Sequence, residues 1–297
     1  MYKVNKFFIN NIVLLFFIFL SVGFIFGQND IGTKMSDEDA SIKAQAIIKR
    51  AVNVINKNSK IKEIDGILLE LQALRVVAPG KRHEWQTNVQ LNLFINFPNQ
   101  IRLEENIDYS SNQQFVTEIL NSPLYSVTSD ISANGKPINV NPNVNSTALK
   151  LSKEQRINLL YQKAFNKILP IILITPWYHD LELKYVGAAE SKDFKAEVIE
   201  AVDKNKNKSR LFFDKQTYLP LMMVEHFTIP NTSKEIERKT YYSDFKSING
   251  LLVAHKLTIQ TGSEMTEEFD LKKLQINPVF KSNLFQLKED KINPYGN

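Results

Sequence analysis

The chain has 297 residues but no cysteine, only 10 glycines and only 4 histidines. Without cysteine there are no disulfides, thiolate nucleophiles or zinc–thiolate sites, and no thioether-linked lipid. The histidines form no H-x-x-x-H pair, and the sequence has neither a G-x-S-x-G motif nor a phosphate-binding glycine loop. These absences predict no catalytic residue, no cofactor and no metal site. A hydrolase built from carboxylates on distant strands is the alternative that the sequence leaves open.

The longest hydrophobic run lies at the N-terminus. Lys3 and Lys6 precede an apolar stretch at 12–26, and polar residues begin after Gly27. This layout is typical of a secretory signal peptide, which we predict at 1–27 with cleavage after Gly27. About fifteen apolar residues fall short of the roughly 18–20 that span a bilayer. We therefore expect a periplasmic protein, with an uncleaved membrane-tethering segment as the alternative.

The remaining chain is nearly neutral. Removing the two lysines of the signal peptide lowers the net charge from +5 to +3, and lysine and glutamate are interspersed throughout. The densest basic run, DKNKNKSR at 203–210, alternates with asparagine and has no aromatic platform beside it. It is therefore interpreted as a turn between strands, and no nucleic-acid partner is expected.

Two segments carry helix signals. At 36–57, Ser36 is a natural N-cap and three acidic residues follow it in the first turn. A second helix begins with Ser152 and Gln155, which form a capping-box pattern. Its end, PIILITPW at 170–177, is unusually apolar. This end either packs on the core or forms a segment that closes a cavity.

Most of the remaining sequence alternates between apolar and polar residues with a period of two, which indicates strands with one buried face. His255 follows such an alternation and is interpreted as a hydrogen-bonded core residue. Short polar turns such as Asn249-Gly250 imply antiparallel neighbours. Ten strands are predicted, at 64–77, 87–97, 99–105, 181–187, 194–202, 209–214, 219–229, 236–245, 251–259 and 265–271.

The hairpin LFFDKQTYLPLMMVEHF at 211–227 shows how the sheet is covered. Asp214 ends one strand and can accept turn hydrogen bonds, whereas Pro220 lacks an N–H and suits the start of the next strand. Leu219, Leu221, Met223 and Phe227 are predicted on one face, and Met222 and Val224 on the other. A strand that is apolar on both faces is covered on both, as in a curved sheet wrapped around helices.

This hairpin also carries a family resemblance. LFFDKQTYLPLMMVEH, then YYSDFKSINGLLVAHKLTI, then LQINPVFKSNLFQL resembles the strand and turn pattern of LolA-like outer-membrane lipoprotein-sorting proteins, and FPNQIRLEEN at 97–106 is similar to an upstream strand of that family. The last 90 residues carry the resemblance best. Ala254, where the family commonly has proline, and an Asn/Pro-rich insertion near 121–150 depart from the family pattern.

The resemblance implies an α+β fold: one domain at 28–297, with a curved antiparallel half-barrel of about 10–11 strands and helices covering its concave face. It also implies an exported, non-enzymatic carrier of lipoprotein acyl chains or other amphiphilic lipids. We expect a monomer with a lipidated protein or lipid as ligand, and an envelope protein as a further partner. The alternative is a non-transporting envelope sensor on the same fold. The candidate cavity residues are Leu91, Leu93, Ile95, Leu221, Met223, Val253, Leu257, Phe269 and Trp177.

Overall fold

The computed structural model describes residues 35–286, except 60, 62, 110–111, 123, 134–135, 139–151, 193, 204–205 and 229–234. The predicted signal peptide lies outside the described residues, as does the part of the predicted insertion after residue 138. Two α-helices are described, α2 (Asp37–Ile55) and α3 (Lys153–Ile172), and a 3-10 helix, η3 (Pro176–Asp180), follows α3. Neither α-helix is both long and apolar enough to cross a bilayer.

The strands form one continuous sheet. They are β1 (Gly66–Val77), β2 (Trp85–Asn96), β3 (Gln100–Tyr109), β4 (Asn112–Asn121), β5 (Leu124–Ala133), β6 (Lys136–Ile138), β7 (Glu182–Glu190), β8 (Lys195–Val202), β9 (Lys208–Asp214), β10 (Pro220–Thr228), β11 (Glu235–Ile248), β12 (Leu251–Thr261) and β13 (Met265–Ile276). Their order in the sheet is β6-β5-β4-β3-β2-β1-β13-β12-β11-β10-β9-β8-β7. The sheet is open, with β6 and β7 at its edges.

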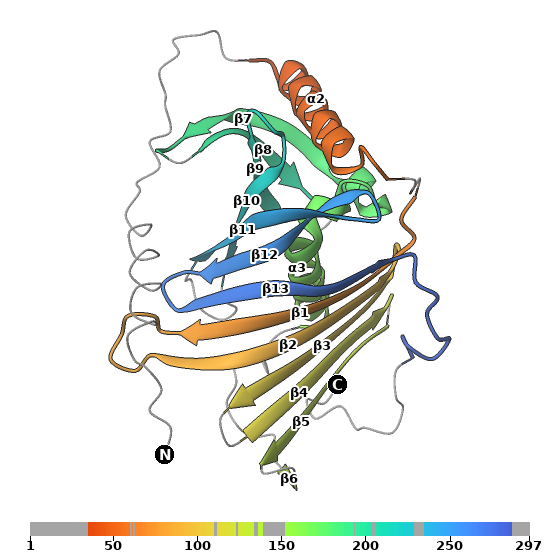
Figure 1. Ribbon diagram of the computed structural model, residues 1–297, viewed down its shortest axis with the longest axis vertical. Coiled ribbons are helices and arrows are strands. Elements are labelled where there is room, and N and C mark those ends of the chain that lie inside the picture. Colours follow the sequence, from red (N-terminus) through yellow and green to blue (C-terminus); the bar gives the residue numbers. More distant parts are fainter. Residues whose placement is uncertain are drawn as a thin grey trace.

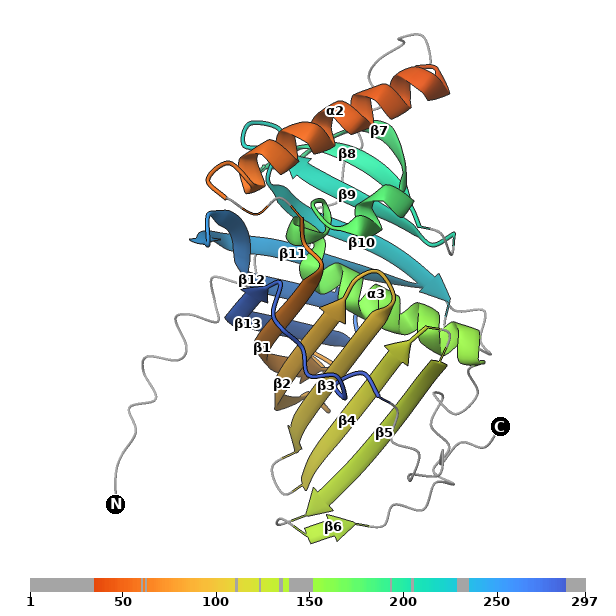
Figure 2. The same cartoon turned by 90° about the vertical axis from the view of Figure 1, so that its right-hand side faces the viewer.

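The sheet consists of two meanders that meet where β1 pairs with β13, and every pairing between neighbours is antiparallel. The chain passes from one edge to the other through α3, which lies across the concave side (Figures 1 and 2). Helix α2 packs beside β7, at the end of the molecule opposite β6. The α+β class and the curved, open antiparallel sheet predicted from the sequence are confirmed.

The sheet has thirteen strands, more than the 10–11 expected. The three additional strands are β4, β5 and β6, which fall in or beside the segment predicted as an insertion. In β4 the pairs Phe115-Val116 and Ile119-Leu120 place apolar residues on both faces, so the period of two is lost. Strand β5 is rich in serine and threonine, which hides its alternation.

The helix starts agree with the sequence signals. The Ser36 side chain accepts a hydrogen bond from the Asp39 N–H, and Ser152 and Gln155 make both bonds of a capping box. Helix α3 then continues through Pro170 to Ile172. Seven consecutive residues at its end, 166–172, are buried, so this part of the helix is enclosed on all sides.

The turns of the hairpins fix the position of α2. Asp214 accepts hydrogen bonds from the N–H groups of Gln216 and Thr217, and Tyr218 adopts a positive φ of 59°. The Tyr218 hydroxyl thereby receives a hydrogen bond from Arg50 of α2. At the predicted turn after β11, Gly250 has φ 86°, and an added Cβ would lie 2.1 Å from the Asn58 carbonyl oxygen. Only glycine fits there.

Strand β10 is apolar on both faces, as predicted, but with one correction. Met223 lies in the main core with both helices, whereas Met222 and Val224 belong to a smaller apolar cluster on the opposite face. Leu221 was expected beside Met223 but packs against the smaller cluster. The reason is a register irregularity between Pro220 and Met222, which shifts the alternation at the start of the strand.

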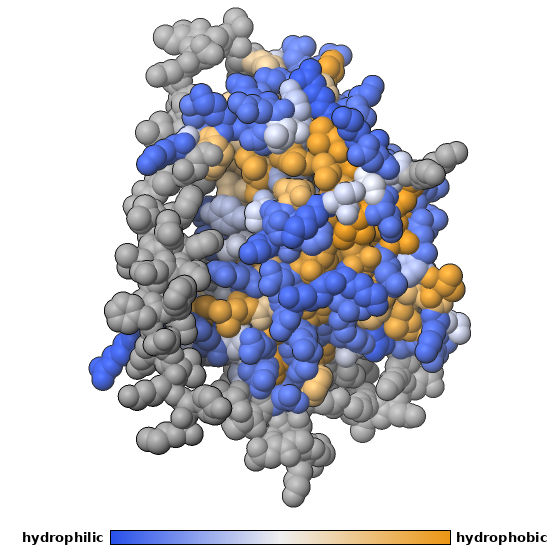
Figure 3. Space-filling view, viewed as in Figure 1, coloured by the Kyte–Doolittle hydropathy of each residue, from blue (hydrophilic) through white to orange (hydrophobic). Residues whose placement is uncertain are grey.

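The outer surface is mixed in character. In the view of Figure 3, hydrophilic residues cover much of the surface and apolar residues interrupt them below α2. The main apolar core lies on the inner side of the sheet, between the strands and the two helices. Any ligand taken up on the concave face would meet this core.

Candidate ligand-binding site

The concave face brings together eight of the nine predicted cavity residues. They share the main core, and the exception is Leu221. Leu91, Leu93, Ile95 and Met223 have no exposed surface, and Trp177 is 6% exposed. The other three, all buried, are Val253, Leu257 and Phe269. Sequence alternation therefore identified an apolar inner lining.

In the described conformation, helices occupy this lining. Leu160, Ala164 and Ile168 of α3 pack into the same core as the strand residues, and Ile48 and Ile55 of α2 do so beside them. A helix with an apolar stripe is the usual cover for an apolar sheet face. The concave face is thus filled by helical side chains and is not an open trough.

Trp177 fixes the segment that follows α3. Its indole Nε1–H donates a hydrogen bond to the Pro98 carbonyl at 2.8 Å, and its ring packs edge-on against Phe97 and Tyr161, with centroids 5.0 and 5.3 Å away. Buried tryptophans combine apolar packing with a satisfied N–H in this manner. The apolar segment 170–177 seen in the sequence is therefore the end of α3 and the start of η3, packed on the core.

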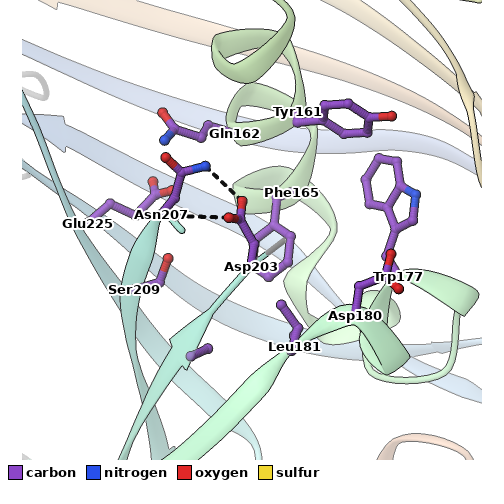
Figure 4. Close-up of a pocket in the computed structure, with 11 residues that line it drawn as sticks. Tyr161, Gln162, Phe165, Trp177, Asp180, Leu181, Asp203, Asn207, Ser209 and Glu225 are labelled. Carbon is purple, nitrogen blue, oxygen red and sulfur yellow. Dashed lines mark hydrogen bonds between the residues drawn. The ribbon is translucent and has the colours of Figure 1, made fainter. Parts of the chain in front are cut away.

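A small cleft lies between α3 and the strands β8 to β10. Tyr161 and Phe165 project into it from α3, and Trp177 and Leu181 complete its apolar wall (Figure 4). Its volume is about 50 Å³, which is room for about four waters at ~10–15 Å³ each. The polar residues that line it are Gln162, Asp180, Asp203, Asn207, Ser209 and Glu225.

The polar rim of the cleft ties α3 to the sheet. Asn158 of α3 and Asn207 exchange two side-chain hydrogen bonds of 3.0 and 2.7 Å, and Asn207 also donates to Asp203 at 2.7 Å. Asp203 and Asn207 belong to the connection between β8 and β9, so the run at 203–210 does contain the predicted turn. These amide contacts join α3 to the connection between β8 and β9.

One end of the concave face carries buried charge instead of apolar side chains. Arg75 lies opposite Glu267 in the pairing of β1 with β13, and its guanidinium contacts Glu267 at 2.8 Å and Glu105 at 3.5 Å. Burial opposes ionisation of the Glu105 carboxyl, but Lys163, Arg75 and Lys167 outweigh it and lower the pKa of Glu105. These groups therefore stay charged in the interior.

Two further pairs complete the charged end. Lys163 of α3 contacts Glu118 of β4 at 2.7 Å, and Arg238 of β11 contacts Glu225 of β10 at 2.8 Å. Burial acts against the charge of Lys163, yet Glu118 and Glu105 together raise its pKa. Lys167, one turn further along α3, is 8% exposed, and burial lowers its pKa to about 8.

Sequence reasoning did not assign these charged residues to the site, although a signal was present. Glu225 and Glu267 occupy inward positions of the strand alternation, in phase with Met223 and Phe269. A charged residue in phase with buried ones predicts either a partner or a ligand. The partners Arg238 and Arg75 lie on neighbouring strands and could be identified only once the strand register was known.

The described residues offer little else for catalysis. They contain no group of three or more His, Asp or Glu side chains that could hold a metal ion. His255 is partly buried, and its Nδ1 lies 3.1 Å from the Val253 carbonyl, as fits a hydrogen-bonded structural residue. The arrangement is suited to holding a ligand with an apolar and a polar part.

No protein-family model and no curated protein matches this sequence. Similar solved structures include a domain from Vibrio parahaemolyticus assigned to outer membrane lipoprotein sorting (TM-score 0.45, 10% identity), a DUF1329 family protein from Desulfovibrio piger (0.45, 12%) and a LolA superfamily protein from Nitrosomonas europaea (0.44, 9%). Each comparison covers 82% of this chain and 97% of the other. The family that the sequence resembles thus reappears among these structures. Similarity at this level concerns the arrangement of strands and helices and says nothing of a ligand.

Proposed function

We propose that this protein is an exported, non-enzymatic carrier that binds the acyl chain of a lipidated protein, or of another amphiphile, on its concave face. The observation that carries the proposal is an apolar inner lining covered by helices, with α3 lying across it, instead of by a second sheet. A helix tied by a few polar contacts can be exchanged for a hydrocarbon chain. The N-terminal export pattern supports a periplasmic location, and one domain with its own core supports a monomer.

Burial supplies a driving force for such an exchange. Each CH₂ removed from water contributes roughly 0.8 kcal/mol, so a chain of about fifteen carbons gains on the order of 12 kcal/mol, against which stand ordering costs and the burial that the α3 side chains lose. The present cleft of about 50 Å³ is too small for such a chain. Helix α3 must therefore move, breaking the Lys163–Glu118 ion pair and the Asn158–Asn207 amide pair, while the acyl chain takes the place of Leu160 and its neighbours.

A reversible crosslink tests whether α3 covers the binding site. In K163C/E118C the new thiols are the only two in the chain, so a short bifunctional thiosulfonate can tie α3 to β4 without side reactions. We expect binding of a fluorescent fatty acid to fall about tenfold after crosslinking and to return when reductant cleaves the link. The matched control is K81C/E264C, a Lys–Glu pair at 2.9 Å that does not involve α3.

Equal binding before and after crosslinking of α3 would show that the helix does not guard the site. Native mass spectrometry of protein purified from cells tests carriage itself, and we expect a co-purified acyl ligand. Recovery of one stoichiometric envelope protein without lipid would instead favour the sensor alternative.

A further inference from the structure

Lys167 is the unmatched cation of the charged end. Within the described chain, no carboxylate oxygen lies within 4 Å of its amine, whereas Arg75, Lys163 and Arg238 each contact a glutamate. Its one hydrogen bond is to the Lys163 carbonyl, at 3.3 Å, and its amine lies 5.5 Å from the Phe269 ring centroid. With a pKa of about 8, the amine is still mostly protonated at neutral pH. A buried ammonium has three donors, so most of its hydrogen-bonding capacity is unused.

Two buried polar atoms without partners lie in the same region. Among the described residues, Asn166 Oδ1 and Thr240 Oγ1 have no hydrogen-bond partner, and the two residues are 1% and 0% exposed. The Tyr242 hydroxyl donates to the Asn166 carbonyl at 2.7 Å, which places this turn of α3 on β11, two residues from Thr240 on the same face. Buried polar atoms nearly always have a partner, so this cluster has the character of a site that accepts one.

The register connects this cluster with the unmatched cation. Thr240 pairs with Ile259, which in turn pairs with Glu267, and Glu267 is the carboxylate that most strongly influences Lys167. An ammonium, a hydroxyl and an amide oxygen therefore belong to the same interface, between α3 and strands β11 to β13. The four nearby glutamates are contacted by Arg75, Lys163 and Arg238, so Lys167 is the cation of this end whose donors are not engaged by a carboxylate of the described residues. A cationic headgroup would find no free carboxylate there.

We propose that the charged end of the concave face is a headgroup subsite, which takes the phosphate or carboxylate of an anionic amphiphile whose acyl chain lies along the apolar end. Lys167 and the Thr240 hydroxyl donate hydrogen bonds to the anionic oxygens, and Asn166 Oδ1 accepts one from a headgroup hydroxyl. The inference rests on the proposed carrier function, because one ligand supplies both the acyl chain and the headgroup. It adds that the ligand lies with its headgroup at the charged end, and that anionic ligands are preferred.

Isothermal titration of three ligands tests the subsite: dodecyl phosphate, the neutral 1-lauroylglycerol and inorganic phosphate. We expect wild-type protein to prefer dodecyl phosphate over lauroylglycerol, and K167M to reduce this preference about tenfold, as for loss of a charge-assisted hydrogen bond. The matched control is K153M, an exposed lysine in the first turn of the same helix, which should keep the wild-type preference.

The outcomes separate the two proposals. Equal affinity for the two amphiphiles, or a preference that persists in K167M, would overturn the subsite and leave the carrier function intact. Tight binding of inorganic phosphate that depends on Lys167, without binding of either amphiphile, would support the anion site and overturn acyl carriage. Binding of none of the three overturns both.

A measurement on wild-type protein covers the case in which K167M does not fold. After reductive ¹³C-methylation, the Lys167 resonance is titrated with pH in the presence of each amphiphile. Dodecyl phosphate should raise the pKa of Lys167, because an anion stabilises the ammonium, and lauroylglycerol should not. An equal response to both ligands would count against the subsite.

Discussion

The two ends of the concave face are built by the same strands from opposite kinds of residue. On β13, Phe269 belongs to the apolar end and Glu267, two positions away on the same face, belongs to the charged end. On β10 the same step separates Met223 from Glu225. The apolar end gains stability directly from burial. The charged end does not, because buried ion pairs rarely improve on apolar residues of similar volume.

Breaking an ion pair at the charged end should give the largest effect. In R238M, Glu225 is left buried at 5% exposure without its guanidinium partner, and unfolding free energy should fall by about 3–5 kcal/mol. The double variant R238M/E225L removes both charges and should recover most of this loss. Urea denaturation of the single and double variants measures both values. A loss below about 1 kcal/mol in R238M would mean that the pair behaves as a solvated one.

An apolar residue should respond differently, since no second substitution restores a lost hydrocarbon contact. L93A removes a side chain with no exposed surface and should cost about 2–5 kcal/mol through lost burial and the cavity left behind. L74A, on the outer face of β1 and 39% exposed, is the matched control and should cost well under 1 kcal/mol. Similar losses in the two variants would contradict the assignment of inner and outer faces.

The difference between the ends also explains what could be predicted from sequence. The apolar end can be predicted from local alternation, because Leu91, Leu93 and Ile95 occupy every second position of one strand and this spacing indicates a buried face. The helix caps at Ser36 and Ser152 are equally local, and both are confirmed. Strands β4 and β5 were missed where that local alternation is interrupted or masked by polar residues.

The charged end could not be predicted in this way, because each of its pairs joins two different elements, so the partners depend on how these elements pack. Arg75 and Glu267 are 192 positions apart, and their contact depends on the closure of β1 on β13. The Lys163–Glu118 contact depends on how α3 crosses the sheet. Alternation marked Glu225 and Glu267 as inward-facing, but only the register of the strands supplied the partners.

Replacing the unmatched Lys167 should change the free energy of unfolding least. It should raise this free energy, whereas R238M and L93A lower it. Its pKa falls from 10.5 in the unfolded chain to about 8 in the folded protein, so below pH 8 folding must bury a charged amine. The gap between these values corresponds to about 3 kcal/mol, and wild-type stability gains this amount as pH rises from 8 to 10.5. K167M removes the cost, so it should be up to about 3 kcal/mol more stable than wild type at pH 7.

The stability difference between K167M and wild type should shrink as pH rises, because the Lys167 amine of the unfolded wild-type protein then loses its proton too. The difference should nearly vanish above pH 10.5. Urea denaturation of wild type, K167M and K153M at pH 7, 9 and 10 measures this dependence, and K153M should track wild type throughout. A K167M protein that is less stable at every pH would show that the amine makes a favourable contact in the ligand-free state. That result would contradict the assignment of Lys167 as an unmatched cation and would make it a structural residue of the core.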